Sequence, residues 1–193
     1  MIEPSIIWQD ENVLLVNKSA GVLTHGKDSL ADWLVGRYPE IKNVGEDAER
    51  PGIVHRLDKE TSGLLLVAKN QKSFQYLKKQ FKERLIKKVY RALVAGVIKE
   101  DRGLIDRPIG VGKKLREAIT YYKILERFPD YTYLELYPKT GRTHQIRKHL
   151  KSIGHPVVCD PLYARSKACP KGITRLGLHA FSLEFNLAKN GVK

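Results

Sequence analysis

The pattern of apolar and polar positions along the chain predicts both strands and helices. Short runs rich in β-branched and aromatic residues predict strands over residues 6–9, 13–17, 64–68, 89–95, 118–125, 131–137 and 178–185. Helical spacing and capping signals predict helices over residues 29–37, 73–84 and 143–153. These elements follow no strict strand–helix–strand repeat. The pattern therefore predicts an α+β fold with a mixed, largely antiparallel sheet and flanking helices.

Local signals sharpen several of these boundaries. Ser29 followed by Asp32 has the spacing of a capping box, which predicts a helix start. Residues 38–52 carry two prolines, two glycines and a run of charges, so we expect a loop there. The glycines of residues 103–112 predict a second loop. Gly154, followed by Pro156, is expected to end the last helix.

The length and composition bound the class of protein. A chain of 193 residues fits a single domain, so we expect one domain over residues 1–193. Residues 1–4 do not resemble a signal peptide, and the apolar runs are too short to span a bilayer, which predicts a cytoplasmic protein. Cys159 and Cys169 form no CxxC pair, so ordinary thiols are expected and a zinc site has little support.

The charge is strongly basic and clustered. Lys and Arg number 35 against 21 acidic residues, for a net charge of +14. Nine basic residues and one acid lie in residues 69–91, and five basic residues, three histidines and no acid lie in residues 139–159. Solubility is one explanation of such a charge. The clustering favours a polyanionic partner, RNA or DNA.

Several segments share residues with familiar motifs but lack the order or spacing that those motifs require. His55–Asp58 has the residues of a kinase catalytic loop in the wrong order, without the glycine-rich loop or Asp-Phe-Gly that should accompany it. His144 and His149 lie five residues apart, about 140° around a helix, which suits joint metal ligation poorly. We therefore predict no metal and no cofactor.

One segment, residues 55–70, reads HRLDKETSGLLLVAKN. It is a polar loop with one acid, Asp58, followed by a core strand. A loop aspartate commonly serves as a cap or turn residue, although a rigid strand behind it would also suit a catalytic carboxylate. The segment closely resembles motif II of the RluA-type pseudouridine synthases, in which this aspartate is catalytic.

Other family features follow in the same order along the chain. Residues 17–25 resemble motif I, with Ser19 where the family usually has proline. Residues 88–96, 140–150 and 178–180 resemble the family's KxYxAlvxG, TGRTHQIRxHL and LHA segments. After Phe185 the chain departs from the family, so a final strand is expected to be missing or replaced. We also expect a catalytic domain alone, without the S4 RNA-binding domain of many relatives.

The resemblance implies a function and a set of site residues. It predicts a pseudouridine synthase catalytic fold and an isomerase, acting as a monomer on uridines of structured rRNA or tRNA. It implies Asp58, Tyr90 and Arg147 as catalytic residues, with Arg147 as the partner of the carboxylate. The implied substrate-binding residues are His55, Arg56, Leu57, Thr61, Arg142, His144 and Leu178.

Alternative interpretations stay open at this level. Arg147 could contact a phosphate or lie on a solvated helix face, and Tyr90 could be a half-buried strand residue. For the whole chain, the first alternative is a non-catalytic RNA-binding or ribosome-assembly module. The second is an N-glycosidic hydrolase that releases uracil.

Overall fold

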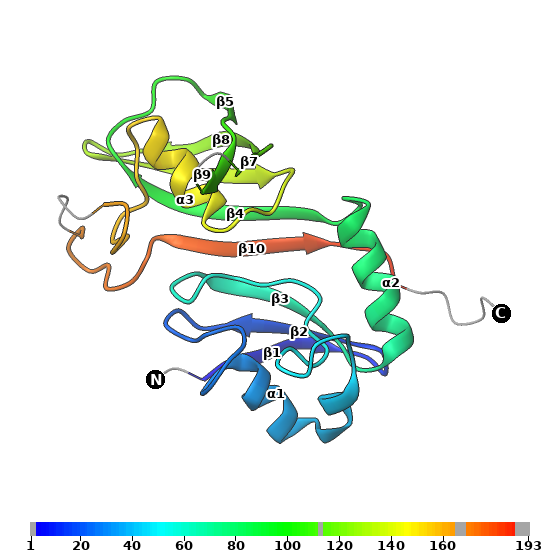
Figure 1. Ribbon diagram of the computed structural model, residues 1–193. Helices are drawn as coiled ribbons and strands as arrows, with labels where there is room; N and C mark the ends of the chain where they lie inside the picture. The colour runs from blue at the N-terminus through cyan, green and yellow to red at the C-terminus, as the bar shows by residue number, and fades with distance from the viewer. Residues whose placement is uncertain (1–2, 112–113, 165–168, 188–193) are drawn as a thin grey trace. The chain divides into compact units, whose positions relative to one another are not determined.

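The structure is a computed structural model that describes residues 3–111, 114–164 and 169–187. The chain forms two compact units (Figure 1). The first comprises residues 1–87 and 183–193, and the second comprises residues 88–182. Among the described residues, no helix has the length and apolarity needed to cross a membrane.

The first unit is built on three antiparallel strands, β1 (Ser5–Gln9), β2 (Val13–Lys18) and β3 (Ser62–Ala68). Strands β1 and β2 form the predicted hairpin, and β2 pairs with β3 from Val13 opposite Ala68 to Lys18 opposite Gly63. Strand β3 is buried along almost its whole length, as its continuous apolar run predicts.

Two α-helices accompany these strands (Figure 1). Helix α1 (Leu30–Arg37) begins at the predicted capping box, where Ser29 and Asp32 cap each other's backbone. Helix α2 (Gln71–Lys82) begins two residues before the predicted helix, because the Asn70 side chain accepts a hydrogen bond from Ser73 N and caps it there. Its buried face includes Phe74 and Leu77.

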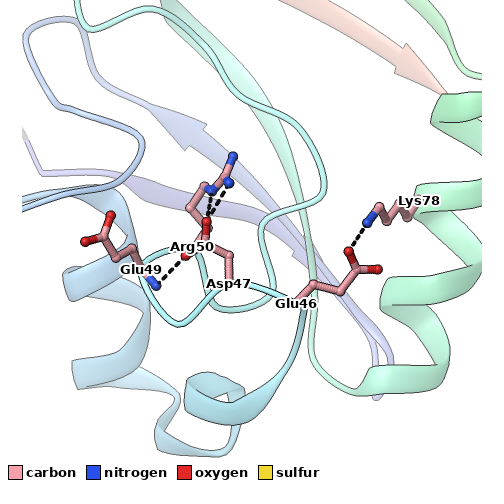
Figure 2. A network of polar contacts seen from close by, with 5 residues as sticks. All are labelled: Glu46, Asp47, Glu49, Arg50 and Lys78. Carbon is pink, nitrogen blue, oxygen red and sulfur yellow. Dashed lines mark hydrogen bonds and ion pairs between the residues drawn. The ribbon is translucent and has the colours of Figure 1, made fainter.

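Residues 38–52 are more ordered than the predicted loop. They contain a 3-10 helix, η1 (Pro39–Asn43), followed by hydrogen-bonded turns. Figure 2 shows the charged network that closes these turns. Arg50 donates two hydrogen bonds to Asp47 at 2.8 and 2.5 Å, and Lys78 of α2 pairs with Glu46. The network joins this segment to α2.

The second unit contains a sheet in the order β10-β4-β9-β8-β5. Its strands are β4 (Lys87–Ala95), β5 (Arg102–Asp106), β8 (Ile119–Arg127), β9 (Tyr131–Pro138) and β10 (Leu178–Glu184). The β4–β9, β8–β9 and β5–β8 pairs are all antiparallel. Strands β6 (Ile109–Val111) and β7 (Lys114–Arg116) form a separate antiparallel pair. The predicted fold class is confirmed.

Helix α3 (Gln145–Ser152) packs on one face of this second sheet. Its Ile146 and Leu150 join a buried core with alternate residues of the strands. The strand residues of that core include Ala92, Val94, Ile105, Tyr122, Leu134, Leu136 and Leu178. The residues that alternate with these point to the opposite face of the sheet.

Three predictions fail in this unit. The loop predicted over residues 103–112 is wrong, because β5 and β6 occupy most of it. Gly103 and Gly110 serve close packing: a Cβ at Gly103 would lie 2.4 Å from the Tyr122 ring, and one at Gly110 would lie 2.0 Å from Lys114 O. The last helix begins at Gln145, later than predicted, because His144 has a left-handed backbone with φ 56°. The expectation of thiols is also wrong.

The structure joins Cys159 and Cys169 in a disulfide with a Cα–Cα distance of 4.9 Å. Their separation of ten residues carries no local signal, so only the path of the chain brings them together. Near the C-terminus, the Gln80 side chain holds the backbone of Asn186 through two hydrogen bonds of 2.9 Å. Residues 188–193, on which the expected change of the final strand depends, lie outside the described residues.

Candidate active site

Asp58 lies half-buried in the loop that leads into β3. Both of its neighbours in sequence are held by the last residue of β2 and the segment that follows it. Thr24 Oγ1 donates to Leu57 O at 2.7 Å and accepts from Leu57 N at 3.3 Å. Lys59 O accepts hydrogen bonds from Gly21 N at 2.9 Å and from Lys18 Nζ at 3.1 Å. Asp58 therefore stands at a fixed backbone position, although the loop has no regular secondary structure.

Lys18 is the least expected member of this arrangement, because its side chain is fully buried. Its ammonium group also donates to Ser19 O at 2.9 Å and to Val22 O at 2.8 Å. Burial lowers the pKa of Lys18 to about 8, while the charges of Glu60 and Asp58 act in the opposite direction. A cation thus lies near the Asp58 carboxylate within the same unit.

The residues before Asp58 have different surroundings. His55 Nε2 accepts a hydrogen bond from Leu66 N at 2.9 Å, and its ring stacks on Phe81 at 4.6 Å. Arg56 is exposed, while Leu57 is buried. His55 therefore ties the loop to β3, and Arg56 extends toward solvent, where a polyanion could reach it. The contacts of these residues with RNA stay predictions.

Two buried polar atoms of this region lack a hydrogen-bond partner among the described residues, Thr61 Oγ1 and His25 Nδ1. Thr61 is only 2% exposed. Buried polar groups in folded proteins are nearly always paired, so a buried hydroxyl without a partner marks a place for water or a ligand. Burial, followed by the charges of Arg56 and Arg50, lowers the pKa of His25, while the charges of Asp47 and Glu49 act in the opposite direction.

In the second unit, the start of α3 is fixed by a small polar network. The Gln145 side chain accepts from Thr140 Oγ1 at 2.7 Å and from Arg142 N at 3.0 Å. Arg142 Nε donates to Glu117 O at 3.0 Å, and His144 Nδ1 lies 3.0 Å from Tyr163 Oη. Arg142 and His144 are thus held at the start of α3, and their predicted contacts with the RNA backbone stay predictions.

Arg147 is 2% exposed on the buried face of α3, so it does not lie on a solvated helix face. Its Nε and Nη2 donate to the two carboxylate oxygens of Asp160, both at 2.8 Å. Its guanidinium also lies 5.1 Å from the centre of the Tyr163 ring. The two bonds to Asp160 use two of the five N–H donors of a guanidinium and fix its plane.

Asp160 is equally constrained. Its side chain is fully buried, and one carboxylate oxygen also accepts from the backbone N–H groups of Leu162 and Tyr163 at 2.9 and 3.0 Å. Burial by itself would raise the pKa of Asp160, but the hydrogen bonds from Arg147 and from these N–H groups hold it below its ordinary value. Asp160 therefore stays ionised and holds Arg147 in place.

Tyr90 and Leu178 lie on the same face of the second sheet as α3. Tyr90 of β4 is half-buried, pairs in register with Leu136 and packs against the core. Leu178 of β10 is 3% exposed and belongs to that core. Their predicted contacts with a uridine stay predictions.

Sequence reasoning missed Lys18, Asp160 and Tyr163. Lys18 lies in a strand pattern where a buried lysine has no periodic signature. Asp160 and Tyr163 lie in an irregular segment after α3, and the composition of this segment predicts only a turn. The only available signal for Asp160 is a single acid close to many basic residues, which marks a possible ion-pair partner.

Comparisons with known proteins place the chain in a family. Residues 12–152 match the family model described as RNA pseudouridylate synthase. The chain is 40% identical over 206 residues to the "Ribosomal large subunit pseudouridine synthase D" of Borreliella burgdorferi, covering 98% of this chain and 63% of that protein. It is 39% identical to the "Uncharacterized RNA pseudouridine synthase YlyB" of Bacillus subtilis, covering 96% of this chain and 65% of that protein. The chain thus spans less than two thirds of these relatives.

A solved structure supports the same assignment. The "Human RNA Pseudouridylate Synthase Domain Containing 1" matches with a TM-score of 0.78 and 32% sequence identity, over 94% of this chain and 78% of that one. The family model covers the Asp58 loop, Tyr90 and Arg147. The chain therefore belongs to the RNA pseudouridylate synthase family, and within it to the RluA type that residues 55–70 resemble.

Proposed function

We propose that this protein is an RNA pseudouridine synthase that isomerises uridines of structured RNA. The observation that carries the proposal is the Asp58 loop of a chain that belongs to this family. Lys18 at the end of β2 holds Lys59, and Thr24 holds Leu57. Such fixation suits a carboxylate that must meet one atom of a substrate. Large-subunit rRNA is the favoured substrate, because several similar proteins are named for it. Transfer RNA is the second.

Asp58, Arg147 and Tyr90 are the proposed catalytic residues. The reaction breaks the bond from N1 of uracil to C1′ of ribose and joins C5 to C1′. The C5 hydrogen leaves as a proton, N1 gains one, and no cofactor or metal is needed. Asp58 could attack C1′, add to C6 or remove a ribose proton. Arg147 would keep Asp58 ionised, and Tyr90 would stack on the uracil and assist proton removal.

The remaining predicted residues would bind the RNA. Leu178 would form an apolar wall, Thr61 Oγ1 would supply a hydroxyl group to the base, and Arg56 would contact a flipped nucleotide or its phosphate. Arg142 and His144 would contact the RNA backbone at the start of α3. His55 would act by shaping the loop, and Leu57 by closing the pocket. We propose one catalytic domain over residues 1–193, active as a monomer in the cytoplasm.

The basic residues of α2 and β4 are proposed phosphate ligands, although some of them also form ion pairs within the protein. Lys78, Lys79 and Lys87 each pair with a carboxylate of the protein. Exposed pairs of this kind are weak, so RNA can replace their partners. RNA affinity should fall steeply with salt. Replacing one phosphate-binding lysine by alanine should reduce the slope of log affinity against log salt by about 0.7–0.9.

The deciding experiment follows the hydrogen at C5 of uridine. Ribosomal and transfer RNA labelled with tritium at C5 would be prepared from cells that lack the protein. Incubation with the protein alone should release tritium to water, while the RNA keeps its chain length and no free uracil appears. Release without any added metal, and in the presence of EDTA, is also expected.

The other outcomes distinguish the alternatives. An RNA-binding or ribosome-assembly module would retain the labelled RNA and release no tritium. A hydrolase would release uracil with the label still attached. Either result would overturn the proposed activity, whatever the natural modification site.

A further inference from the structure

The two faces of the second sheet differ sharply. One face carries α3, Tyr90 and the apolar core. Residues of odd number in β4, β9 and β10 point to the other face, because side chains alternate along a strand. That face is exposed: Phe181 and Tyr121 are each 42% exposed, and Leu104 is 52% exposed. We call it the open face.

The open face is rich in aromatic rings and cations. Tyr121 lies opposite Tyr137, and Lys123 and Arg91 lie on either side of Glu135. The Arg91 guanidinium stacks over the Phe181 ring at 3.4 Å. The aromatic residues of the open face are Tyr121, Tyr133, Tyr137 and Phe181, and its cations are Arg91, Arg102 and Lys123.

A cavity of about 540 Å³ lies at the β10 side of the open face. Arg91, Tyr133, His179 and Phe181 line it from the strands, and residues 172–177 close it with a loop that carries Arg175. Volumes of this size are typical of pockets for small ligands. The cavity therefore combines stacking surfaces with a cationic rim.

The charges around the cavity favour an anionic ligand. Glu135 pairs with Arg91 at 3.1 Å, which offsets one cation, while Arg175 is exposed at the rim. Burial, followed by the charges of Arg175 and Arg91, lowers the pKa of His179. The described residues that line the cavity therefore include two arginines, Arg91 and Arg175, and no carboxylate.

We propose that the open face is a second RNA-binding surface, and that this cavity holds one nucleotide of a single-stranded segment. The base would stack on Phe181 or Tyr133, and a phosphate would pair with Arg175. Exposed aromatics on a sheet, with neighbouring arginines, are how several modules bind single strands. The inference rests on the proposed function for its choice of RNA, but the surface lies on the opposite side of the sheet from Tyr90. It would bind RNA flanking the modified uridine.

The test uses the full chain and a fluorescently labelled single-stranded oligoadenylate, which contains no uridine to isomerise. Phe181→Ala should weaken binding by about 5- to 100-fold, the range for loss of one stacked base. Phe181→Tyr, which keeps the ring, should bind within about twofold of wild type. Arg175→Ala should weaken binding by several fold and reduce the salt slope by about 0.7.

Matched controls lie in the first unit. Trp8 is an exposed aromatic of β1, and Arg37 lies over the Trp33 ring of α1 at 5.9 Å. Trp8→Ala and Arg37→Ala should bind oligoadenylate as the wild type does. If Phe181→Ala and Arg175→Ala lose no more affinity than these controls, the proposal is wrong. Circular dichroism would verify that each variant is folded.

Tritium release separates this inference from the proposed activity. Phe181→Ala should keep the wild-type kcat on long labelled RNA and raise only KM. If Phe181→Ala loses oligoadenylate binding and the wild type releases no tritium, the second RNA-binding surface is supported and the proposed isomerase activity is rejected. If an acidic peptide, polyglutamate, binds in a Phe181-dependent manner while oligoadenylate does not, the surface serves a protein partner and the proposal fails.

Discussion

The Asp58 loop and the start of α3 hold their key side chains by opposite means. Asp58 is half-buried, and backbone carbonyls and N–H groups fix its neighbours. Arg147 is buried, and the Asp160 carboxylate holds its charged group directly through two hydrogen bonds. The Asp58 loop is thus held through main-chain hydrogen bonds of its neighbouring residues, whereas Arg147 is held through a buried ion pair with Asp160.

This difference predicts how each region responds to mutation. Removing the Asp58 side chain leaves the hydrogen bonds of Leu57 and Lys59 in place, so the loop should keep its backbone path while the proposed chemistry is lost. Removing either member of the Arg147–Asp160 pair leaves a buried charge without that partner, which is strongly destabilising. Loss of Asp58, the proposed catalytic carboxylate, should therefore lower stability less than loss of either member of the buried Arg147–Asp160 pair.

The largest effect is expected for Asp58→Ala. Turnover should fall by about 10³-fold or more, as for other residues that act on the reacting atoms. RNA affinity and the free energy of unfolding should stay close to wild type. Tritium release under single-turnover conditions, together with urea denaturation, measures both. Near wild-type turnover would contradict the role of Asp58, and a large loss of stability would contradict the description of its loop.

Next comes Asp160→Ala, which should lower the free energy of unfolding by about 3–5 kcal/mol by leaving the Arg147 charge buried. The double variant Arg147→Met/Asp160→Leu should recover most of that stability while staying inactive. Urea denaturation of the three proteins provides the comparison. A loss below about 1 kcal/mol, the level of an exposed pair, would show that the ion pair is not buried in solution.

The Arg147–Asp160 pair also predicts that folding stability is lost at acid pH. The pKa of Asp160 is lower in the folded protein than the unfolded value of about 3.9, so the folded state binds fewer protons in acid. The stabilisation is complete above about pH 5 and is lost as the pH falls through the folded pKa. The stability difference between wild type and Asp160→Asn should therefore shrink below about pH 4. A difference that is constant from pH 3 to about 7 would argue against the low pKa.

A smaller effect is expected for Lys18→Met, which removes the donor to Ser19 O, Val22 O and Lys59 O. Stability at pH 7 should fall by about 1–3 kcal/mol for the carbonyls left without this donor. Turnover should fall by about tenfold, the factor for roughly 1.4 kcal/mol of lost positioning. Unchanged turnover would show that the lysine does not help position Asp58.

Lys18 also predicts a dependence on alkaline pH. Its pKa is about 8 in the folded protein, below the unfolded value of about 10.4. The unfolded state therefore binds more protons from pH 8 to 10.4, and stability rises with pH there. Relative to Lys18→Met, the wild type should gain about 3 kcal/mol over that range. Parallel stability curves for the two proteins would contradict the low pKa.

The smallest effect on folding is expected for Thr61→Val. Because Thr61 Oγ1 has no hydrogen-bond partner among the described residues, its removal should leave stability unchanged or raise it by up to about 1 kcal/mol. If Thr61 binds the uridine, KM should rise by several fold. Thr61→Ser, which keeps the hydroxyl, is the matched control. A destabilised valine variant with normal KM would show that the hydroxyl serves the fold instead.

The sequence predicted most elements of the fold because their signals are local. The capping box at Ser29 and the apolar run of β3 both act within a few residues. Residues 103–112 were predicted as a loop because of their glycines. Gly103 instead lies in β5, where the Tyr122 ring of the paired strand β8, distant in sequence, leaves no space for a side chain. Long-range contacts of this kind leave no local pattern.

The residues of the candidate site also divide into those that the sequence could propose and those that only the folded chain shows. Asp58, Tyr90 and Arg147 could be proposed because each lies in a motif that resembles the family. Asp160 lies outside these motifs, and Lys18 lies in the segment that resembles motif I but received no role there, because a buried lysine and a turn aspartate look ordinary in sequence. Only the folded chain shows that one donates to three carbonyls and the other pairs with Arg147.

The central claim is that Asp58 and Arg147 act together in the isomerisation. A double-mutant cycle of Asp58→Asn and Arg147→Lys, measured as tritium release with enzyme in excess, tests it most directly. Arg147→Lys keeps a positive charge beside Asp160. If the residues act as a pair, the double variant should release tritium within about threefold of Asp58→Asn, because the guanidinium has no role once the carboxylate is gone. A double variant slowed by the full product of the two single effects would contradict the claim.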